Sequence, residues 1–250
     1  MMRGDTQKIN RAIERIKKSD IHGCITGSSM TGENFDDWAS TPDIDVFVYG
    51  RYELMYAVGY LIGTGEFEYK SSGERTKVEW LRDGSSNKKY QLDTVKLVSD
   101  GIELNITYKR GCSSLLNVLS SFDMTIIMVG YDIQRKVFVD LRTGAGAYDP
   151  EFKWPMSKHT AYPNPMLLVH DTVFDVAYAT RQFDRVMKYW DRGFDTRPMA
   201  RFYIDKIDSV IEKGAEFKTE KSIDIYNQFV EEQTAMKEKI QMWLDDKEDI

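Results

Sequence analysis

Two aspartates separated by one apolar residue, Asp43-Ile44-Asp45, form the stretch with the clearest chemical potential. Alternate residues of a β-strand face the same way, so a strand here would place both carboxylates on one face and Ile44 in the core. Two fixed carboxylates this close repel each other unless a cation lies between them. Mg²⁺ takes one or two carboxylates and completes its shell with phosphate oxygens and water. The spacing therefore predicts a site for Mg²⁺ or Mn²⁺.

A small polar turn, Gly27-Ser28-Ser29, precedes the aspartates and follows a short apolar run. Small residues at a turn let backbone N–H groups approach a phosphate closely. A turn of this kind beside paired carboxylates would hold a nucleoside triphosphate with its metal. The same groups would stabilise charge on a phosphoryl group during its transfer. Either piece alone is often only a turn or a surface charge, and it is their order along the chain that indicates function.

Gly27-Ser28 followed by the strand Asp43–Val48 resembles the signature of the DNA polymerase β-like nucleotidyltransferase superfamily. The resemblance covers about residues 6 to 145. It implies an α+β fold with a small mixed β-sheet and flanking helices. It also implies two metal ions held by Asp43, Asp45 and a third carboxylate on a later strand. Asp43 and Asp45 would be catalytic, and Gly27, Ser28 and Ser29 would contact the triphosphate.

The third carboxylate is where this chain departs from that pattern. The best-matching strand, Ile102–Tyr108, carries Asn105 at the expected position. Glu103 shares the face of Asn105 about 6.6 Å along the strand and is the first candidate for the third metal ligand and catalytic residue. Asp123, directly before an apolar run, is the second candidate for the third metal ligand. A site without a third carboxylate is the remaining alternative, because an amide supplies no negative charge to a metal.

Four cations follow at spacings of four, three and four in the C-terminal part of the chain, which places them on one helix face. They are Arg181, Arg185, Lys188 and Arg192. We expect Arg185 and Lys188 to neutralise the triphosphate. The alternative is a solvated helix face, with neighbouring aspartates as partners. The segment also resembles the ending of helical regions that follow some nucleotidyltransferase domains.

Composition excludes several classes of protein. The 250 residues are 42% apolar and 30% charged with a net charge of −6, which suits a packed, soluble protein. Two cysteines make no disulfide scaffold, and neither lies in a metal-type CxxC pair. No apolar run approaches the ~20 residues of a membrane span, and the N-terminus has no secretory h-region. We expect a cytoplasmic protein without a membrane partner.

The elements that position these residues follow from periodicity and turn residues. Helices are expected at the N-terminus to Lys18 and over 52–61 and 113–120. Strands are expected over 43–49, 90–98, 102–108, 124–131 and 136–141. The dipeptide Asp100-Gly101, which is favoured in tight hairpins, predicts a hairpin between the second and third of these strands. A proline-rich and aromatic segment predicts a boundary, which gives a nucleotidyltransferase-like domain over 1–149, a linker over 150–165 and a helical domain over 166–250. In that domain we expect helices over 167–190, 199–212 and 223–244.

The leading hypothesis is a metal-dependent nucleotidyltransferase that moves a nucleoside monophosphate from an NTP to an acceptor hydroxyl and releases pyrophosphate. The alternative is a catalytically weakened nucleotidyltransferase fold that acts as a nucleotide-binding or regulatory module, favoured by Asn105. A third is a structural protein with a helical dimerisation arm, favoured by an apolar stripe over 226–244 that would support a homodimer. The acceptor stays open between a protein, a tRNA end, a sugar and a small molecule.

Overall fold

The computed structural model describes residues 3–31, 43–80, 86–142, 158–164, 176–215 and 223–248. The chain divides into two compact units, Met1–Lys158 and His159–Ile250. The first is a mixed α+β unit and the second is helical, so the α+β class predicted from the sequence is confirmed. In the part that is described, no helix is both long and apolar enough to cross a membrane.

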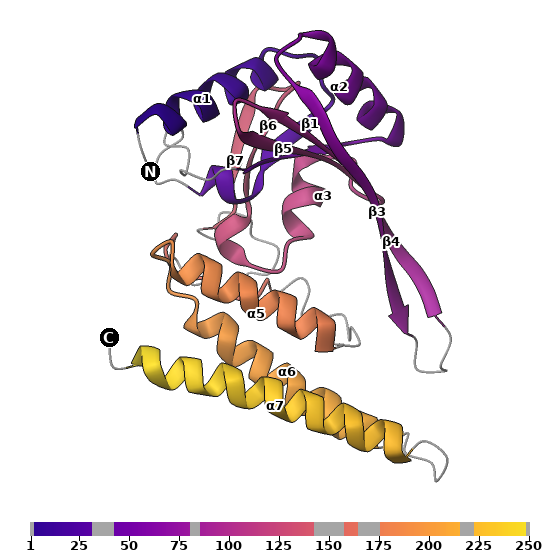
Figure 1. Ribbon diagram of the computed structural model, residues 1–250, viewed down its shortest axis with the longest axis vertical. Helices are drawn as coiled ribbons and strands as arrows, with labels where there is room; N and C mark the ends of the chain where they lie inside the picture. Colours follow the sequence, from indigo (N-terminus) through magenta and orange to yellow (C-terminus); the bar gives the residue numbers. More distant parts are fainter. Residues whose placement is uncertain are drawn as a thin grey trace. The chain divides into compact units, whose positions relative to one another are not determined.

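A seven-stranded mixed sheet forms the centre of the first unit, in the order β3-β4-β5-β2-β1-β6-β7 (Figure 1). The strands are β1 (Gly23–Thr26), β2 (Asp43–Val48), β3 (Glu68–Trp80), β4 (Ser86–Ser99), β5 (Ile102–Lys109), β6 (Val129–Asp132) and β7 (Val137–Asp140). Neighbours pair antiparallel except β2 and β5, which run parallel. The parallel pair sets Asp43 opposite Glu103 and Asp45 opposite Asn105.

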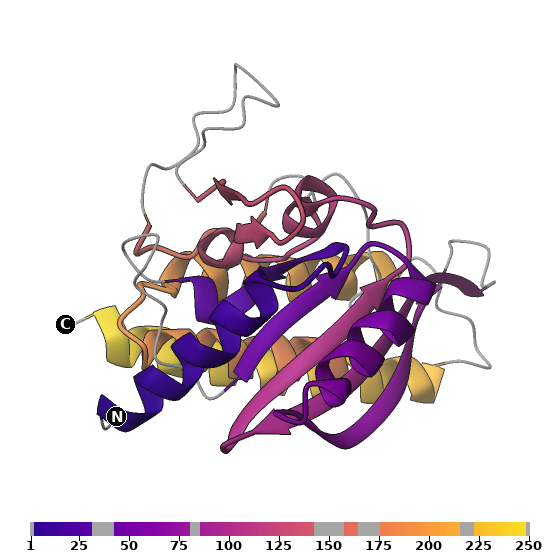
Figure 2. The ribbon, with the colours of Figure 1, turned by 90° about the horizontal axis from the view of Figure 1, so that it is seen from above.

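Helices α1 (Arg3–Lys17) and α2 (Arg51–Gly63) cover one face of this sheet (Figures 1 and 2). The apolar residues of α1 recur at helical spacing and bury Ile9, Ile13 and Ile16 against the sheet. From β2, Ile44 and Val46 enter the same core. Because side chains alternate along a strand, Asp43 and Asp45 lie on the other face.

The other face carries α3 (Leu115–Ser120), which begins at a cap where Ser114 Oγ accepts the N–H of Asn117 over 3.3 Å. Its apolar residues pack against Cys24 of β1 and Phe47 of β2. Cys24 is fully buried. Burial raises the pKa of its thiol to about 12, so it is a packing residue at neutral pH.

Most elements of the first unit match the expectations from sequence. Asp100 and Gly101 have φ of 51° and 82° and close the predicted hairpin between β4 and β5. The strand predicted over 124–131 is wrong in its first half, where Thr125–Ile127 form the 3₁₀ turn η2 before β6 begins at Val129. Strand β3 was not predicted, because its sequence is polar and lacks an alternating apolar pattern.

The second unit contains α5 (Val176–Trp190), α6 (Arg197–Ala215) and α7 (Ile223–Glu248), and residues 167–175 of the predicted first helix lie outside the described residues. The apolar side of α7 packs within the chain: Ile240 and Leu244 are buried, and Trp243 makes edge contacts with Phe183 and Trp190. A homodimer through this helix stays a prediction. Most of the predicted linker over 150–165 also lies outside the described residues, and the structure divides the chain after Lys158.

Candidate functional site

The turn after β1 brings the backbone against the paired aspartates. Residues Gly27–Met30 form the 3₁₀ turn η1, in which Ser28 and Ser29 are buried. The Ser29 hydroxyl donates to the Thr26 carbonyl over 3.3 Å and so holds the turn internally. Gly27 has φ of 78°, and a Cβ there would overlap Asp45 Oδ2. Glycine is therefore required both by the backbone conformation and by the approach of the Asp45 carboxylate.

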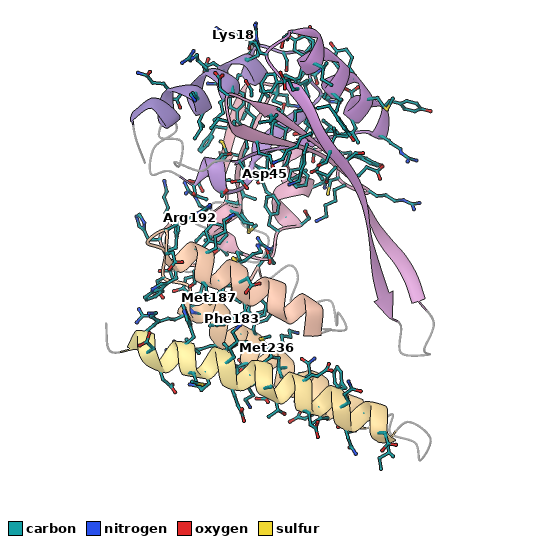
Figure 3. The ribbon with its side chains drawn as sticks, in the orientation of Figure 1. Lys18, Asp45, Phe183, Met187, Arg192 and Met236 are labelled. Carbon is teal, nitrogen blue, oxygen red and sulfur yellow. The ribbon has the colours of Figure 1, made fainter. Side chains whose placement is uncertain are left out.

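Asp43 and Asp45 are half-buried on one face of β2, while Ile44 between them is fully buried on the other. Figure 3 shows Asp45 on the side of the sheet away from α1 and α2. The β1 register places Thr26 directly opposite Asp45. The Thr26 hydroxyl donates to the Val129 carbonyl over 2.7 Å, which ties β1 to β6 beside the aspartates. Strand alternation thus delivers the two-carboxylate face that the sequence predicts.

Asn105 on β5 lies directly beside Asp45. Its Nδ2 donates to Asp45 Oδ1 over 3.0 Å. Since an ionised carboxylate only accepts hydrogen bonds, this contact sets which end of the amide faces Asp45. The amide oxygen, Asn105 Oδ1, is buried and has no hydrogen-bond partner among the described residues. A buried acceptor without a partner costs free energy, and it marks a place where an added donor or cation would be stabilising.

Glu103 lies opposite Asp43 in the register, but its carboxylate is bound by two lysines. Lys70 of β3 contacts Oε2 and Lys96 of β4 contacts Oε1. The hydrogen bonds from Lys70 and Lys96 outweigh the effect of burial and lower the pKa of Glu103. Neither lysine was identified from the sequence, because β3 was not recognised and its pairing with β4 could not be placed.

Asp123 lies in the segment between α3 and η2, half-buried and outside any strand. Across the described ranges, no three His, Cys, Asp or Glu side chains gather in a group able to hold a metal ion. Glu103 and Asp123 as third metal ligands therefore stay predictions. The carboxylates of Asp43 and Asp45 and the amide oxygen of Asn105 are nevertheless hard oxygen donors, which fits Mg²⁺ or Mn²⁺.

A buried arginine that was not identified from the sequence binds the residue that follows η1. Arg142 is 2% exposed and binds both carboxylate oxygens of Asp140, from Nε over 2.9 Å and from Nη2 over 2.8 Å. Its Nη1 donates to the carbonyl of Thr31, the residue after η1, over 3.2 Å. The planar guanidinium makes all three bonds at once, which a lysine cannot. Arg142 therefore ties the end of the β6–β7 hairpin to the turn beside Asp45.

The predicted cationic face belongs to the second unit. Arg185 and Lys188 lie on α5, where Lys188 is exposed and Arg185 half-buried. The Arg192 guanidinium lies over the ring of Tyr189 at 5.5 Å. The side chain of Arg181 lies outside the described residues. Contacts of Arg185 and Lys188 with a triphosphate remain an expectation from the sequence.

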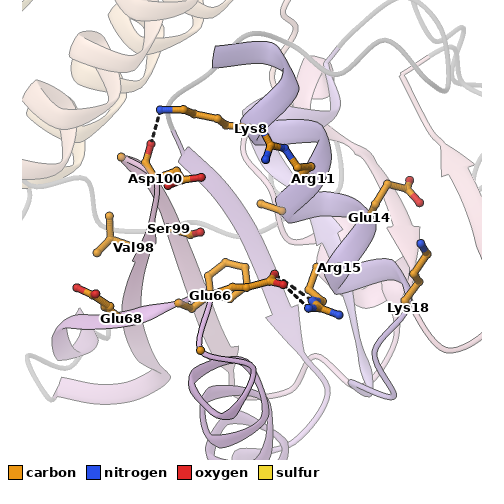
Figure 4. Close-up of a pocket in the computed structure, with 14 residues that line it drawn as sticks. Lys8, Arg11, Glu14, Arg15, Lys18, Glu66, Glu68, Val98, Ser99 and Asp100 are labelled. Carbon is orange, nitrogen blue, oxygen red and sulfur yellow. Dashed lines mark hydrogen bonds and ion pairs between the residues drawn. The ribbon is translucent and has the colours of Figure 1, made fainter. Parts of the chain in front are cut away.

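A separate cavity of about 780 Å³ lies between α1, the connection from α2 to β3 and the turn between β4 and β5 (Figure 4). Three basic side chains of α1 and Lys18, just after the helix, face acidic side chains on the other wall and on α1 itself. Arg15 pairs with Glu66, and Lys8 donates to the carbonyl of Asp100 over 3.2 Å. None of the residues proposed for the site lines this cavity. Its charges balance, so it lacks the positive excess that a phosphate site needs.

Comparison with known proteins adds no assignment. No protein-family model matches the chain, and a search of curated proteins finds no match.

Proposed function

We propose that the first unit is a metal-dependent nucleotidyltransferase that transfers a nucleoside monophosphate from an NTP to an acceptor hydroxyl and releases pyrophosphate. One observation carries the proposal: Asp43 and Asp45 project from one face of β2, with the Asp45 carboxylate against Gly27 of the turn after β1. This combination brings metal-binding oxygens next to a backbone suited to phosphate. It agrees with the resemblance to the DNA polymerase β-like superfamily drawn from the sequence.

In this proposal Asp43 and Asp45 hold the divalent cation, and the amide oxygen of Asn105 takes the place of the third carboxylate. A divalent cation bound there neutralises the triphosphate and stabilises the charge that develops during transfer. Gly27 lets the turn run close to the phosphates. Arg142, through the Thr31 carbonyl, holds the exit of the turn in place. Preorganised groups of this kind supply most of the rate in phosphoryl transfer.

The test incubates the protein with Mg²⁺ and each α-labelled NTP in turn, with and without candidate acceptors, and measures label transfer and pyrophosphate release. Wild type is expected to release pyrophosphate with at least one NTP, whereas Asp45→Asn is expected to release none. Pyrophosphate release that persists in Asp45→Asn would place the activity elsewhere.

A second candidate function is a nucleotide-binding or regulatory module without catalysis. Asn105 favours it, because an amide in place of a carboxylate leaves the site with less negative charge for a metal. The same assay separates the two functions. NTP binding that depends on Asp45 but releases no pyrophosphate with any acceptor would favour the binding module.

A further inference from the structure

We infer that Lys70 and Lys96 form an anion subsite for a phosphate group carried by the acceptor, and that the Glu103 carboxylate occupies this subsite in the absence of the acceptor. The link to the acceptor rests on the proposed function. The anion subsite itself is independent of it.

The first support is the convergence of two cations on one carboxylate. Lys70 and Lys96 come from different strands, and each contacts a different oxygen of Glu103. The two ammonium groups therefore flank a planar anion from two sides. A phosphate presents several oxygens to such a pair and carries up to two charges, so it is a stronger partner than a carboxylate.

A β-bulge provides the second support. The register between β3 and β4 shifts between Tyr69 and Ser71, so that Lys70 is the extra residue beside Lys96. Bulges re-aim a side chain and are frequent next to active sites. Lys70 lies at this bulge, and its ammonium group contacts the Glu103 carboxylate.

The third support is the place of these lysines relative to Asp45. The register runs from Asp45 to Asn105 and from Asn105 to Lys96, so the three residues form one row across β2, β5 and β4. Directly paired residues point to the same face of a sheet. Adjacent strands lie about 4.8 Å apart, so the Cα atom of Lys96 lies about 10 Å from the Cα atom of Asp45. If the hydroxyl of an acceptor lies at the aspartates, a phosphate group a few bonds from that hydroxyl can reach the two lysines.

The contacts are also exchangeable. The side chains of Lys70 and Lys96 are 52% and 41% exposed, and that of Glu103 is 22% exposed. Ion pairs at this exposure are worth little, so an incoming phosphate can displace the carboxylate.

Two lysines suit one phosphate group rather than a polyanion. Recognition of a nucleic-acid backbone uses many cations along a surface, and this chain has a net charge of −6. We therefore assign the subsite to a small phosphorylated acceptor, such as a sugar phosphate.

The experiment measures binding of inorganic phosphate by calorimetry and ³¹P NMR, without metal or nucleotide. Wild type is expected to bind phosphate weakly. Glu103→Gln removes the competing charge and should bind at least about fivefold more tightly, since it frees both lysines. Adding Lys70→Gln and Lys96→Gln to that variant should abolish the gain. Lys18→Gln, an exposed lysine just after α1, is the matched control and should change nothing.

Two outcomes overturn the inference. Unchanged phosphate binding in Glu103→Gln would overturn the subsite, and weaker Mn²⁺ binding in the same variant would make Glu103 a metal ligand, as the sequence predicts. Displacement of phosphate by a single-stranded oligonucleotide far more readily than by ribose 5-phosphate would replace the small acceptor by nucleic acid. Phosphate binding at the lysines in a protein that releases no pyrophosphate would leave the subsite standing and remove the proposed function.

Discussion

Asn105 donates a side-chain N–H to Asp45 across the parallel pair β2–β5, and within the described part of the chain its own oxygen is buried without a hydrogen-bond partner. A carboxylate in the same place would repel Asp45 unless a cation were present. The amide stabilises the metal-free site, because it replaces that repulsion by a hydrogen bond. The expected cost is weaker binding of the metal.

This relationship predicts the effect of Asn105→Asp. The variant should lose stability without metal, because it sets a third negative charge next to Asp45, and should bind Mn²⁺ more tightly, because the charge of the site rises. Thermal unfolding with and without Mn²⁺ measures both effects. Asn105→Ala is the matched variant and should weaken Mn²⁺ binding. Equal Mn²⁺ affinity in wild type and both variants would remove Asn105 from the site.

Asp45→Asn tests the metal site directly. Wild type should bind Mg²⁺ or Mn²⁺ more tightly with NTP present than without it, because the phosphates complete the metal shell. Asp45→Asn should lose this coupling while it stays folded. Asp100→Asn, in the exposed turn between β4 and β5, is the control and should keep it. Calorimetric curves that coincide for wild type and Asp45→Asn would rule the site out.

Gly27→Ala tests the approach of η1 to Asp45. Gly27 and Gly65 have similar positive φ, 78° and 73°, but only a Cβ at Gly27 meets a neighbour. Gly65→Ala should therefore cost about 1–2 kcal/mol of unfolding free energy, the strain of this conformation. Gly27→Ala should cost more and should also weaken Mn²⁺ binding, because it displaces the Asp45 carboxylate. Denaturant unfolding measures the difference, and equal losses for the two variants would contradict a close contact.

Arg142→Gln tests the buried ion pair with Asp140. Burial raises the pKa of Asp140, but the hydrogen bonds and charge of Arg142, with a smaller contribution from Lys158, hold it below its usual value. The stability that this carboxylate contributes is therefore present above the unfolded-state pKa, about 3.9, and is lost as the pH falls through the lower folded-state pKa. Breaking one partner of a buried pair costs about 3–5 kcal/mol.

We expect Arg142→Gln to show this full loss near pH 7 and a smaller loss near pH 4, where a protonated Asp140 needs no counter-charge. Urea unfolding at several pH values measures it. The control is the double variant Arg142→Gln with Asp140→Asn, which should recover most of the loss at pH 7. A loss that does not depend on pH would mean that Arg142 stabilises the fold by packing alone.

Gln233→Met is expected to stabilise the helical unit. Gln233 of α7 is fully buried, and neither its Nε2 nor its Oε1 has a hydrogen-bond partner in the ranges that the structure describes. Replacing such a group by an apolar side chain of similar shape removes a penalty of about 1–3 kcal/mol. Gln228→Met, at an exposed position of the same helix, should change little. A lower melting temperature in Gln233→Met would show that the amide binds an ordered water.

Periodicity and turn residues were enough to predict the helices, the Asp43–Val48 strand and the hairpin closed by Asp100 and Gly101. These signals are local, because each arises from residues that are neighbours in the sequence. The first half of the 124–131 strand failed because an apolar run does not by itself distinguish a strand from a buried 3₁₀ turn. Strand β3 failed because edge pairing with β4 tolerates polar residues.

For the candidate site, alternation along one strand predicted that Asp43 and Asp45 share a face. The partners of Glu103 were not predictable, since they depend on the order of the strands and on a bulge at Lys70. Arg142 was missed for the same reason: its hydrogen bond to the Thr31 carbonyl joins residues 111 positions apart. Contacts of this kind follow from topology, which no spacing rule reveals.

The parallel pairing of β2 with β5 also bears on how the protein folds. Asp45 and Asn105 are 60 positions apart, and the chain between them forms α2 and the β3–β4 hairpin. The β4–β5 hairpin closes through two residues and can form early, whereas β2–β5 pairing must first close a long loop. The capacity to bind metal should thus appear only with the slowest step of refolding. Formation of the Asp45–Asn105 hydrogen bond would then indicate that β2 and β5 have paired.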